Sequence, residues 1–153
     1  MTITPAIRWP HAFDPVRSPV HVVNQLELAA APAAVWARLI RASAWPDWYA
    51  NAAKVKIENG GENLSAGARF TWRTFGVDLV SEVEEFVPGE RIAWVARASG
   101  VTAYHAWLIT PTALGCHVLT EETQHGVLAR LGRVVFPGRM ERWHQRWLEG
   151  LGG

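Results

Sequence analysis

Apolar residues recur at helical spacing near the C-terminus of the chain, after a long run of strand-like segments. They form two stripes, one of Val127, Leu131 and Val134 and one of Met140, Trp143, Trp147 and Leu151. At about 100° per residue the stripes point in different directions, and the change falls at Pro137-Gly138, where helical hydrogen bonding is interrupted. We predict two helical segments, or one kinked helix, over residues 126–151. This region should lie on a sheet, and its second segment should present both tryptophans to that sheet.

The preceding part of the chain consists of short runs of apolar and polar residues bounded by glycine and proline. The runs predict strands at residues 20–29, 54–58, 68–75, 77–87, 91–98, 101–110 and 115–124, a short helix at 33–40 and an aromatic turn or one-turn helix at 45–49. Short connections favour antiparallel neighbours in a meander. The predicted fold class is α+β, a curved antiparallel sheet of six or seven strands wrapped around a long C-terminal helix, with two short helices after the first strand.

Residues 1–19 have a different character from the remainder of the chain. They contain four prolines and little periodicity, which is typical of an extended arm. Trp9 and Phe13 are the residues that could hold this arm against the body of the protein. We therefore expect an N-terminal arm at residues 1–19 and one domain at residues 20–153.

Composition limits the classes of function. The chain has 153 residues, of which 49% are apolar and 19% charged, as in a globular domain. A formal charge of +1 argues against a nucleic-acid partner. We expect no stable membrane insertion and a cytoplasmic location, because there is no long apolar run, no signal-like start and only one cysteine. Nine tryptophans indicate either an aromatic core or an aromatic-lined cavity.

Several segments fall in register with a known superfamily. They are the alanine- and proline-rich residues 29–34, Val35-Trp36, Trp45-Pro46-Asp47-Trp48, Glu82-Val83, the segment 88–92, Trp94, the segment 105–111, Gly115, Glu122 and Gly126. In this order the chain resembles the START-like (SRPBCC) helix-grip superfamily, which includes polyketide cyclases and dehydrases. The resemblance covers roughly residues 20–151. It implies an apolar cavity between the sheet and the C-terminal helix, in proteins that bind lipids, hormones or polyketides and only sometimes catalyse a reaction.

One polar pair follows from the register of the last two strands. A tight turn centred between residues 113 and 114 places His105 opposite Glu122, on the face that also carries Trp107 and Thr120. Inside a cavity, His105 and Glu122 could act as a catalytic acid/base pair. The alternative is a structural pair that fixes the register, and such pairs are more common than catalytic ones. In either case, contact with the carboxylate should raise the pKa of His105 above about 6.5.

The same alternation of side chains predicts which residues line the cavity. The expected ligand-binding residues are Leu79, Ser81, Trp94, Trp107 and Thr120 from the sheet and Met140, Trp143 and Trp147 from the helix. For any single tryptophan, a packed core is the simpler explanation. The cavity is expected for the set because the family resemblance implies it.

No pair of histidines has the spacing of a helical metal site, and His144 lies between Trp143 and Trp147 on the predicted helix. We therefore expect no metal and no other cofactor. The C-terminal region also carries an arginine face, composed of Arg130, Arg133, Arg139, Arg142 and Arg146. Such a face is usually solvated, although it could attract an anionic ligand or a membrane surface.

Three functions are compatible with these features. The first is binding of a small apolar molecule, such as a lipid, a polyketide or an aromatic compound, in the cavity. The second is a cyclase- or dehydrase-type enzyme that uses His105 and Glu122. The third is a protein-interaction module, or a homodimer, formed through residues 140–151, because exposed tryptophans would be costly. Binding requires the least machinery and is the preferred hypothesis.

Overall fold

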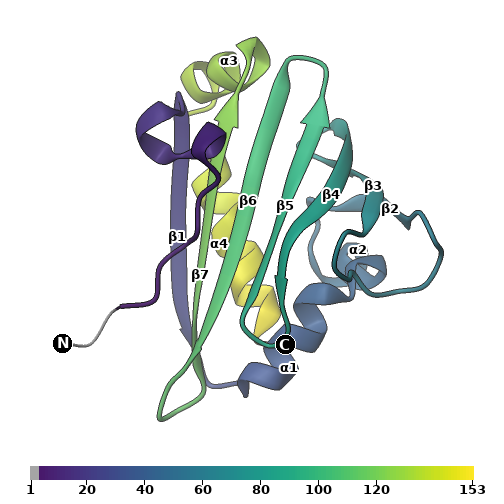
Figure 1. Ribbon diagram of the computed structural model, residues 1–153, viewed down its shortest axis with the longest axis vertical. Coiled ribbons are helices and arrows are strands. Elements are labelled where there is room, and N and C mark those ends of the chain that lie inside the picture. Colours follow the sequence, from purple (N-terminus) through teal and green to yellow (C-terminus); the bar gives the residue numbers. More distant parts are fainter. Residues whose placement is uncertain (1–3) are drawn as a thin grey trace.

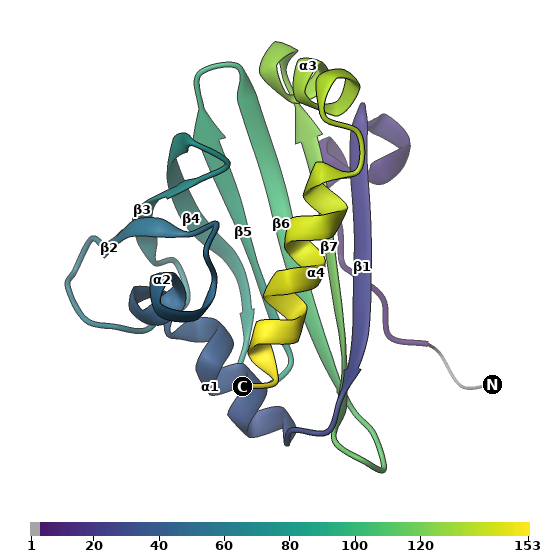
Figure 2. The same cartoon turned by 180° about the vertical axis from the view of Figure 1, so that it is seen from behind.

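A computed structural model describes residues 4–153 of the chain. Its central feature is a seven-stranded antiparallel sheet with helices on one face and at both ends (Figures 1 and 2). The strands are β1 (Val20–Leu28), β2 (Ala53–Ile57), β3 (Arg69–Thr74), β4 (Val77–Val87), β5 (Arg91–Ala98), β6 (Val101–Pro111) and β7 (Cys116–His125). The α-helices are α1 (Pro32–Ile40), α2 (Trp45–Trp48), α3 (Val127–Val135) and α4 (Arg139–Leu151). The predicted α+β helix-grip fold is confirmed.

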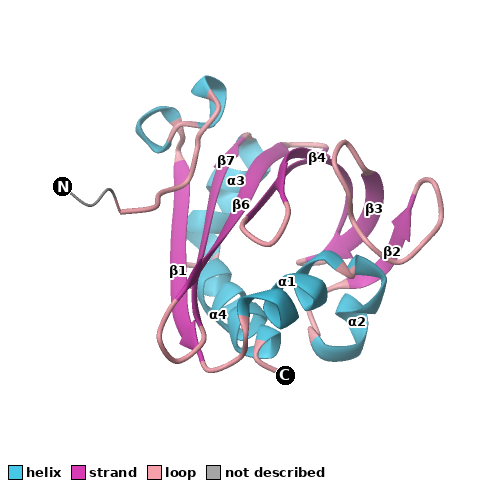
Figure 3. Cartoon of the chain, turned by 60° about the horizontal axis from the view of Figure 1, so that its bottom comes forward, coloured by secondary structure: helices cyan, strands magenta, loops and turns pink. Residues whose placement is uncertain are grey.

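The strand order is β1-β7-β6-β5-β4-β3-β2, so the first strand pairs with the last. Strands β2 to β7 form the predicted meander, in which each strand pairs with the next one along the chain. The connections from β3 to β7 are short turns, whereas the longer segment 58–68 joins β2 to β3. The sheet curves strongly, and α1 and α2 lie beside its lower end in Figure 3. This curvature creates a concave face that a single helix can cross.

Helix α4 crosses the concave face, as Figure 2 shows. Its N-terminal half is attached to β1 by Asn24, whose Nδ2 donates to the backbone oxygen of Glu141 (2.9 Å) and to Oε1 of Gln145 (3.1 Å). The buried residues of α4 are His144, Trp147, Leu148 and Leu151. Trp143 lies at the edge of this face and is only partly buried, so the prediction that α4 presents both tryptophans to the sheet is correct for Trp147 alone.

Helices α3 and α4 are separate, and the chain between them turns at Gly138, which has a φ of 76°. The apolar stripe of α3 was predicted to pack on the sheet, and this prediction is wrong. Val127, Leu131 and Val134 are exposed (80%, 55% and 79%), and Ala129 is the buried residue of this helix. The reason is that α3 lies at one end of the sheet, where it contacts β1, β6 and β7 but does not cross the concave face.

Residues 4–19, the part of the predicted N-terminal arm that the structure describes, pack on the outer, convex face of the sheet, and residues 1–3 of the arm lie outside the described residues. The arm contains two single-turn 3-10 helices, η1 (His11–Phe13) and η2 (Pro15–Arg17). Trp9 and Phe13 contact the ring of Tyr104, with centroids 5.7 and 5.5 Å apart, and Thr123 Oγ1 donates to the backbone oxygen of Phe13 (2.8 Å). The arm therefore covers the middle strands on the side opposite to α4.

Candidate functional site

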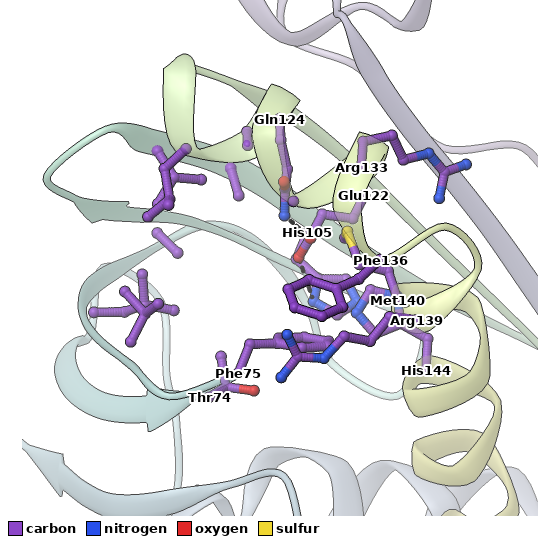
Figure 4. A pocket seen from close by; sticks show the side chains of 18 of the residues that line it. Thr74, Phe75, His105, Glu122, Gln124, Arg133, Phe136, Arg139, Met140 and His144 are labelled. Atoms are coloured by element: carbon purple, nitrogen blue, oxygen red, sulfur yellow. Dashed lines mark hydrogen bonds and ion pairs between the residues drawn. The ribbon is translucent and has the colours of Figure 1, made fainter.

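A cavity of about 310 Å³ lies between the concave face of the sheet and helices α3 and α4. Strands β3, β4 and β5 contribute an apolar wall with a single polar residue, Thr74. The other polar lining residues come from β6, β7, α4 and the end of α3. These are His105, Glu122, Gln124, Arg133, Arg139 and His144. The polar groups of the cavity thus gather on one side, among apolar residues, and the opposite side is almost entirely apolar (Figure 4).

The structure brings six of the predicted site residues to this cavity. They are Leu79, Trp94, His105, Glu122, Met140 and Trp147. Four others lie elsewhere: Ser81, Trp107, Thr120 and Trp143. Ser81 is buried, but its Oγ accepts a hydrogen bond from the indole of Trp72 (3.1 Å), which itself lines the cavity. A position on the concave face of a strand is therefore not enough to make a residue line the cavity, because larger neighbours separate some of these residues from the open space.

The other three residues, Trp107, Thr120 and Trp143, also lie outside the cavity. Trp107 packs against the rings of His105 and Trp147, with both centroid distances 5.0 Å, so it supports these two lining residues. Thr120 is fully buried below His105. Trp143 lies beside the guanidinium of Arg146, at 4.8 Å from the ring centroid. The argument for a dimer contact assumed that both tryptophans of α4 would otherwise be exposed. Trp147 is only 1% exposed, so this argument does not apply to it.

The predicted pairing of the last two strands is confirmed. His105 lies opposite Glu122, Trp107 opposite Thr120 and Ile109 opposite Val118. Nδ1 of His105 is 3.2 Å from Oε1 of Glu122, and both side chains are buried. The two groups are therefore close enough to share a proton.

The hydrogen bonds around His105 determine its tautomer. Thr120 Oγ1 donates its single proton to the backbone oxygen of Ala106 (3.0 Å). In its contact with Nε2 of His105 (2.8 Å), the same oxygen must therefore accept, so the proton of the neutral imidazole is on Nε2. Nδ1 consequently directs a lone pair towards Glu122. A carboxyl proton on Oε1 completes this contact in the neutral state.

The pKa shifts agree with a neutral pair and correct the expectation of a raised histidine pKa. Burial, reinforced by the nearby imidazole of His144, lowers the pKa of His105 well below 6.5. Burial also raises the pKa of Glu122 to about 7, although the hydrogen bond from Gln124 Nε2 (2.7 Å) favours the carboxylate. The sequence predicted that the two side chains are neighbours but not how deeply they are buried. At this degree of burial, the loss of solvation outweighs the attraction between the two charged forms.

His144 is the principal site residue that the sequence analysis missed. Its ring lies against that of His105, with centroids 4.7 Å apart and planes at 24°. It is 2% exposed, its Nδ1 has no hydrogen-bond partner among residues 4–153, and burial lowers its pKa to about 4. Its spacing of three and seven residues from Trp147 and Leu151 places it on the same helix face, a signal that the more conspicuous tryptophan stripe obscured.

Aromatic residues also surround the opening of the cavity. The guanidinium of Arg139 lies over the rings of Phe75 (5.2 Å) and Phe136 (4.9 Å), as Figure 4 shows. Phe136 lines the cavity and is also 52% exposed, so the cavity reaches the surface here. Phe75 has a φ of 51° in the tight turn before β4, and its amide donates to Oδ1 of Asn51 (3.0 Å). Sequence periodicity could not identify these turn and junction residues.

Comparison with known proteins agrees with this architecture. The sequence profile of the family described as "Polyketide cyclase / dehydrase and lipid transport" matches residues 19–152. The chain belongs to this family. A comparison with curated proteins finds no match.

Solved structures extend the relationship. The crystal structure of the hypothetical protein jhp0584 from Helicobacter pylori is 33% identical, with a TM-score of 0.90, and the alignment covers 99% of this chain and 96% of that one. TTHA0849 from Thermus thermophilus shares the fold at 16% identity, with a TM-score of 0.71 and coverage of 87% and 94%. StfQ, a di-domain ARO/CYC from the steffimycin biosynthetic pathway, shares it at 17% identity, with a TM-score of 0.69 and coverage of 87% and 50%.

Among residues 4–153, no helix is both long enough and apolar enough to span a bilayer.

Proposed function

We propose that the protein binds a small, mainly apolar molecule that carries one polar group. The observation that supports this most directly is the distribution of polar groups in the cavity. The wall from β3, β4 and β5 is apolar except for Thr74, and the other polar groups gather on the opposite wall, here called the polar wall, which β6, β7, α3 and α4 form. An apolar pocket with a few convergent polar groups is the usual form of a small-molecule site. Membership of a family described by cyclase, dehydrase and lipid-transport functions supports the same proposal.

The polar wall favours a neutral oxygen on the ligand. Near neutral pH, the raised pKa of Glu122 keeps a large share of this carboxyl group protonated, so it can donate a hydrogen bond. His144 is neutral at this pH and offers a nitrogen without a partner in the described part of the chain. A hydroxyl, phenol or carbonyl group fits these partners without burying an additional charge.

Binding can be tested with N-phenyl-1-naphthylamine, a neutral apolar fluorophore. Trp94 and Trp147 line the cavity, so bound probe should quench tryptophan emission and gain sensitised fluorescence. Leu79→Glu should abolish this signal because it places a charge in the cavity. Val80→Glu is the matched control, since Val80 lies one position along β4 and is 47% exposed. The binding proposal is refuted if the wild-type protein gives no saturable signal, or if both variants behave alike. Native mass spectrometry of freshly purified protein would show whether a molecule co-purifies.

A second candidate function is acid/base catalysis of the cyclase or dehydrase type. It is favoured by the 3.2 Å contact between Glu122 and His105 inside a ligand-sized cavity. Dehydration requires one group that removes a proton from carbon and another that protonates the leaving hydroxyl, and a neutral carboxyl group beside neutral imidazoles supplies both. With the co-purified molecule as substrate, Glu122→Gln should retain binding and lose turnover if the protein is an enzyme. A carrier should show no turnover in either form.

A further inference from the structure

Three buried side chains from three different elements converge at the polar wall of the cavity. His105 comes from β6, Glu122 from β7 and His144 from α4 (Figure 4). One potential ligand atom from each, an imidazole nitrogen or a carboxylate oxygen, lies within 4.8 Å of the other two. The expectation of no metal was based on spacing along single elements, and such spacing cannot detect a group assembled across a sheet and a helix.

The hydrogen bonds leave these atoms available as ligands. Nε2 of His105 carries the proton that binds Thr120, so the lone pair of Nδ1 points towards Glu122. When Glu122 is ionised, Oε1 and Nδ1 are two acceptors 3.2 Å apart, so together they offer adjacent lone pairs to a cation. His144 adds a buried Nδ1 to which no residue between 4 and 153 forms a hydrogen bond.

We propose that His105, Glu122 and His144 bind a divalent transition-metal ion. Two imidazoles and one carboxylate form the ligand set of many catalytic zinc sites and of non-haem iron sites, which keep coordination positions open. Here the open positions face the cavity, because all three residues line it. Metal–ligand bonds of about 2.0–2.2 Å place ligand atoms about 3.0–3.6 Å apart. The His105–Glu122 distance of 3.2 Å already fits this range, and the other separations, at most 4.8 Å, need to shorten by no more than about 1–2 Å.

Neighbouring residues already hold two of the ligands in place. Thr120 accepts the Nε2 proton of His105, and Gln124 donates to Oε2 of Glu122 (2.7 Å), which leaves Oε1 free for the ion. Outer contacts of this kind fix the tautomer and orientation of metal ligands. The stacking of His105 on Trp107 further restricts rotation of its ring. The metal site does not depend on the proposed apolar ligand, and its test uses the metal alone.

The test uses untagged protein that has been freed of metal with EDTA and then exchanged into chelator-free buffer. Titration with CoCl₂ should give a visible d–d absorption band that saturates at one ion per chain, and ZnCl₂ should displace it. His144→Gln, His105→Gln and Glu122→Gln should each weaken Co²⁺ binding at least tenfold. His117→Gln is the matched control, because His117 lies on β7 but contacts Gln25 on the outer face (2.9 Å).

Several outcomes would overturn the proposal. These are a wild-type protein with no saturable band, a stoichiometry unchanged by His144→Gln, or equal loss of binding in His117→Gln, which would indicate adventitious surface binding. Circular dichroism of each metal-free variant identifies any that fails to fold, and the remaining ligand variants then decide. Failure of this test leaves N-phenyl-1-naphthylamine binding unaffected, so the two proposals fail separately.

Discussion

Filling the cavity is the most direct test of whether it is empty space available to a ligand. Ala103 on β6 lines the cavity opposite Ala96 of β5 and is 5% exposed. The substitution Ala103→Phe directs a phenyl ring into this space. An apolar cavity of about 150 Å³ can hold a benzene molecule, so the new ring should occupy roughly half of the 310 Å³ cavity.

The magnitude follows from burial of the ring. Transfer of a phenyl side chain from water to an apolar environment stabilises by about 1.5–3 kcal/mol, and restricting the side chain costs about 1 kcal/mol. The free energy of unfolding should therefore rise by about 0.5–2 kcal/mol in ligand-free protein. For a chain of 153 residues this corresponds to a rise in Tm of roughly 1–8 °C. If the space were already packed, the same substitution would destabilise by about 1–3 kcal/mol.

Urea unfolding and probe titration measure the two effects separately. Ala103→Phe should stabilise the fold and weaken N-phenyl-1-naphthylamine binding at least tenfold. Val80→Phe, with its added ring on the exposed face, should leave binding unchanged and alter stability by less than about 0.5 kcal/mol. A destabilised Ala103→Phe variant, or one that binds the probe like the wild type, would refute the assignment of this space as a ligand cavity.

Three other predictions concern packing and ionisation. Gly115→Ala should lower the free energy of unfolding in urea by about 3 kcal/mol or more, because the new Cβ would lie 2.1 Å from the backbone oxygen of Leu28. Gly132→Ala, which has open space around it, should instead stabilise α3 by up to about 1 kcal/mol. Equal effects of the two substitutions would contradict this prediction. In metal-free protein with EDTA, His144 contributes stability that is complete above its ordinary pKa of 6.5 and is lost as the pH falls to its folded value of about 4. Between pH 7.5 and 4.5, wild type should therefore lose about 2–3 kcal/mol relative to His144→Gln, and parallel pH profiles would exclude this. Burial raises the pKa of the Cys116 thiol, so iodoacetamide should label it in urea but not in native protein; rapid native labelling would show that the β7 end opens.

The sequence predicted those parts of the fold that depend on local patterns. Turn residues separated the strands, and the tight turn before β7 was sufficient to place His105 opposite Glu122. The pairing of β1 with β7 could not be obtained in this way, because no short turn joins them. The position of α3 could not be predicted either, since its apolar stripe does not indicate that the helix packs at the end of the sheet.

The candidate site was predicted as a pair and observed as a group of three. The missing member, His144, depends on the rotation of α4 about its axis. The buried face of α4 keeps Trp147 and Leu151 from the predicted stripe but adds His144 and Leu148, which lie outside it. The ionisation state was predicted in the wrong direction for His105, because it depends on the depth of burial. These quantities arise from tertiary packing and require coordinates.

The N-terminal arm has a consequence for how related sequences should be interpreted. Ala93, Val95, Tyr104 and Ala106 form an apolar patch on the convex face, beneath Ile7, Trp9 and Phe13. The family match begins at residue 19, so a protein shortened to that boundary would expose the patch to water. Relatives without such an arm should carry polar residues at the four patch positions, whereas relatives with one should retain apolar residues there. The side chains at these positions should therefore indicate whether a given relative covers this face with an arm.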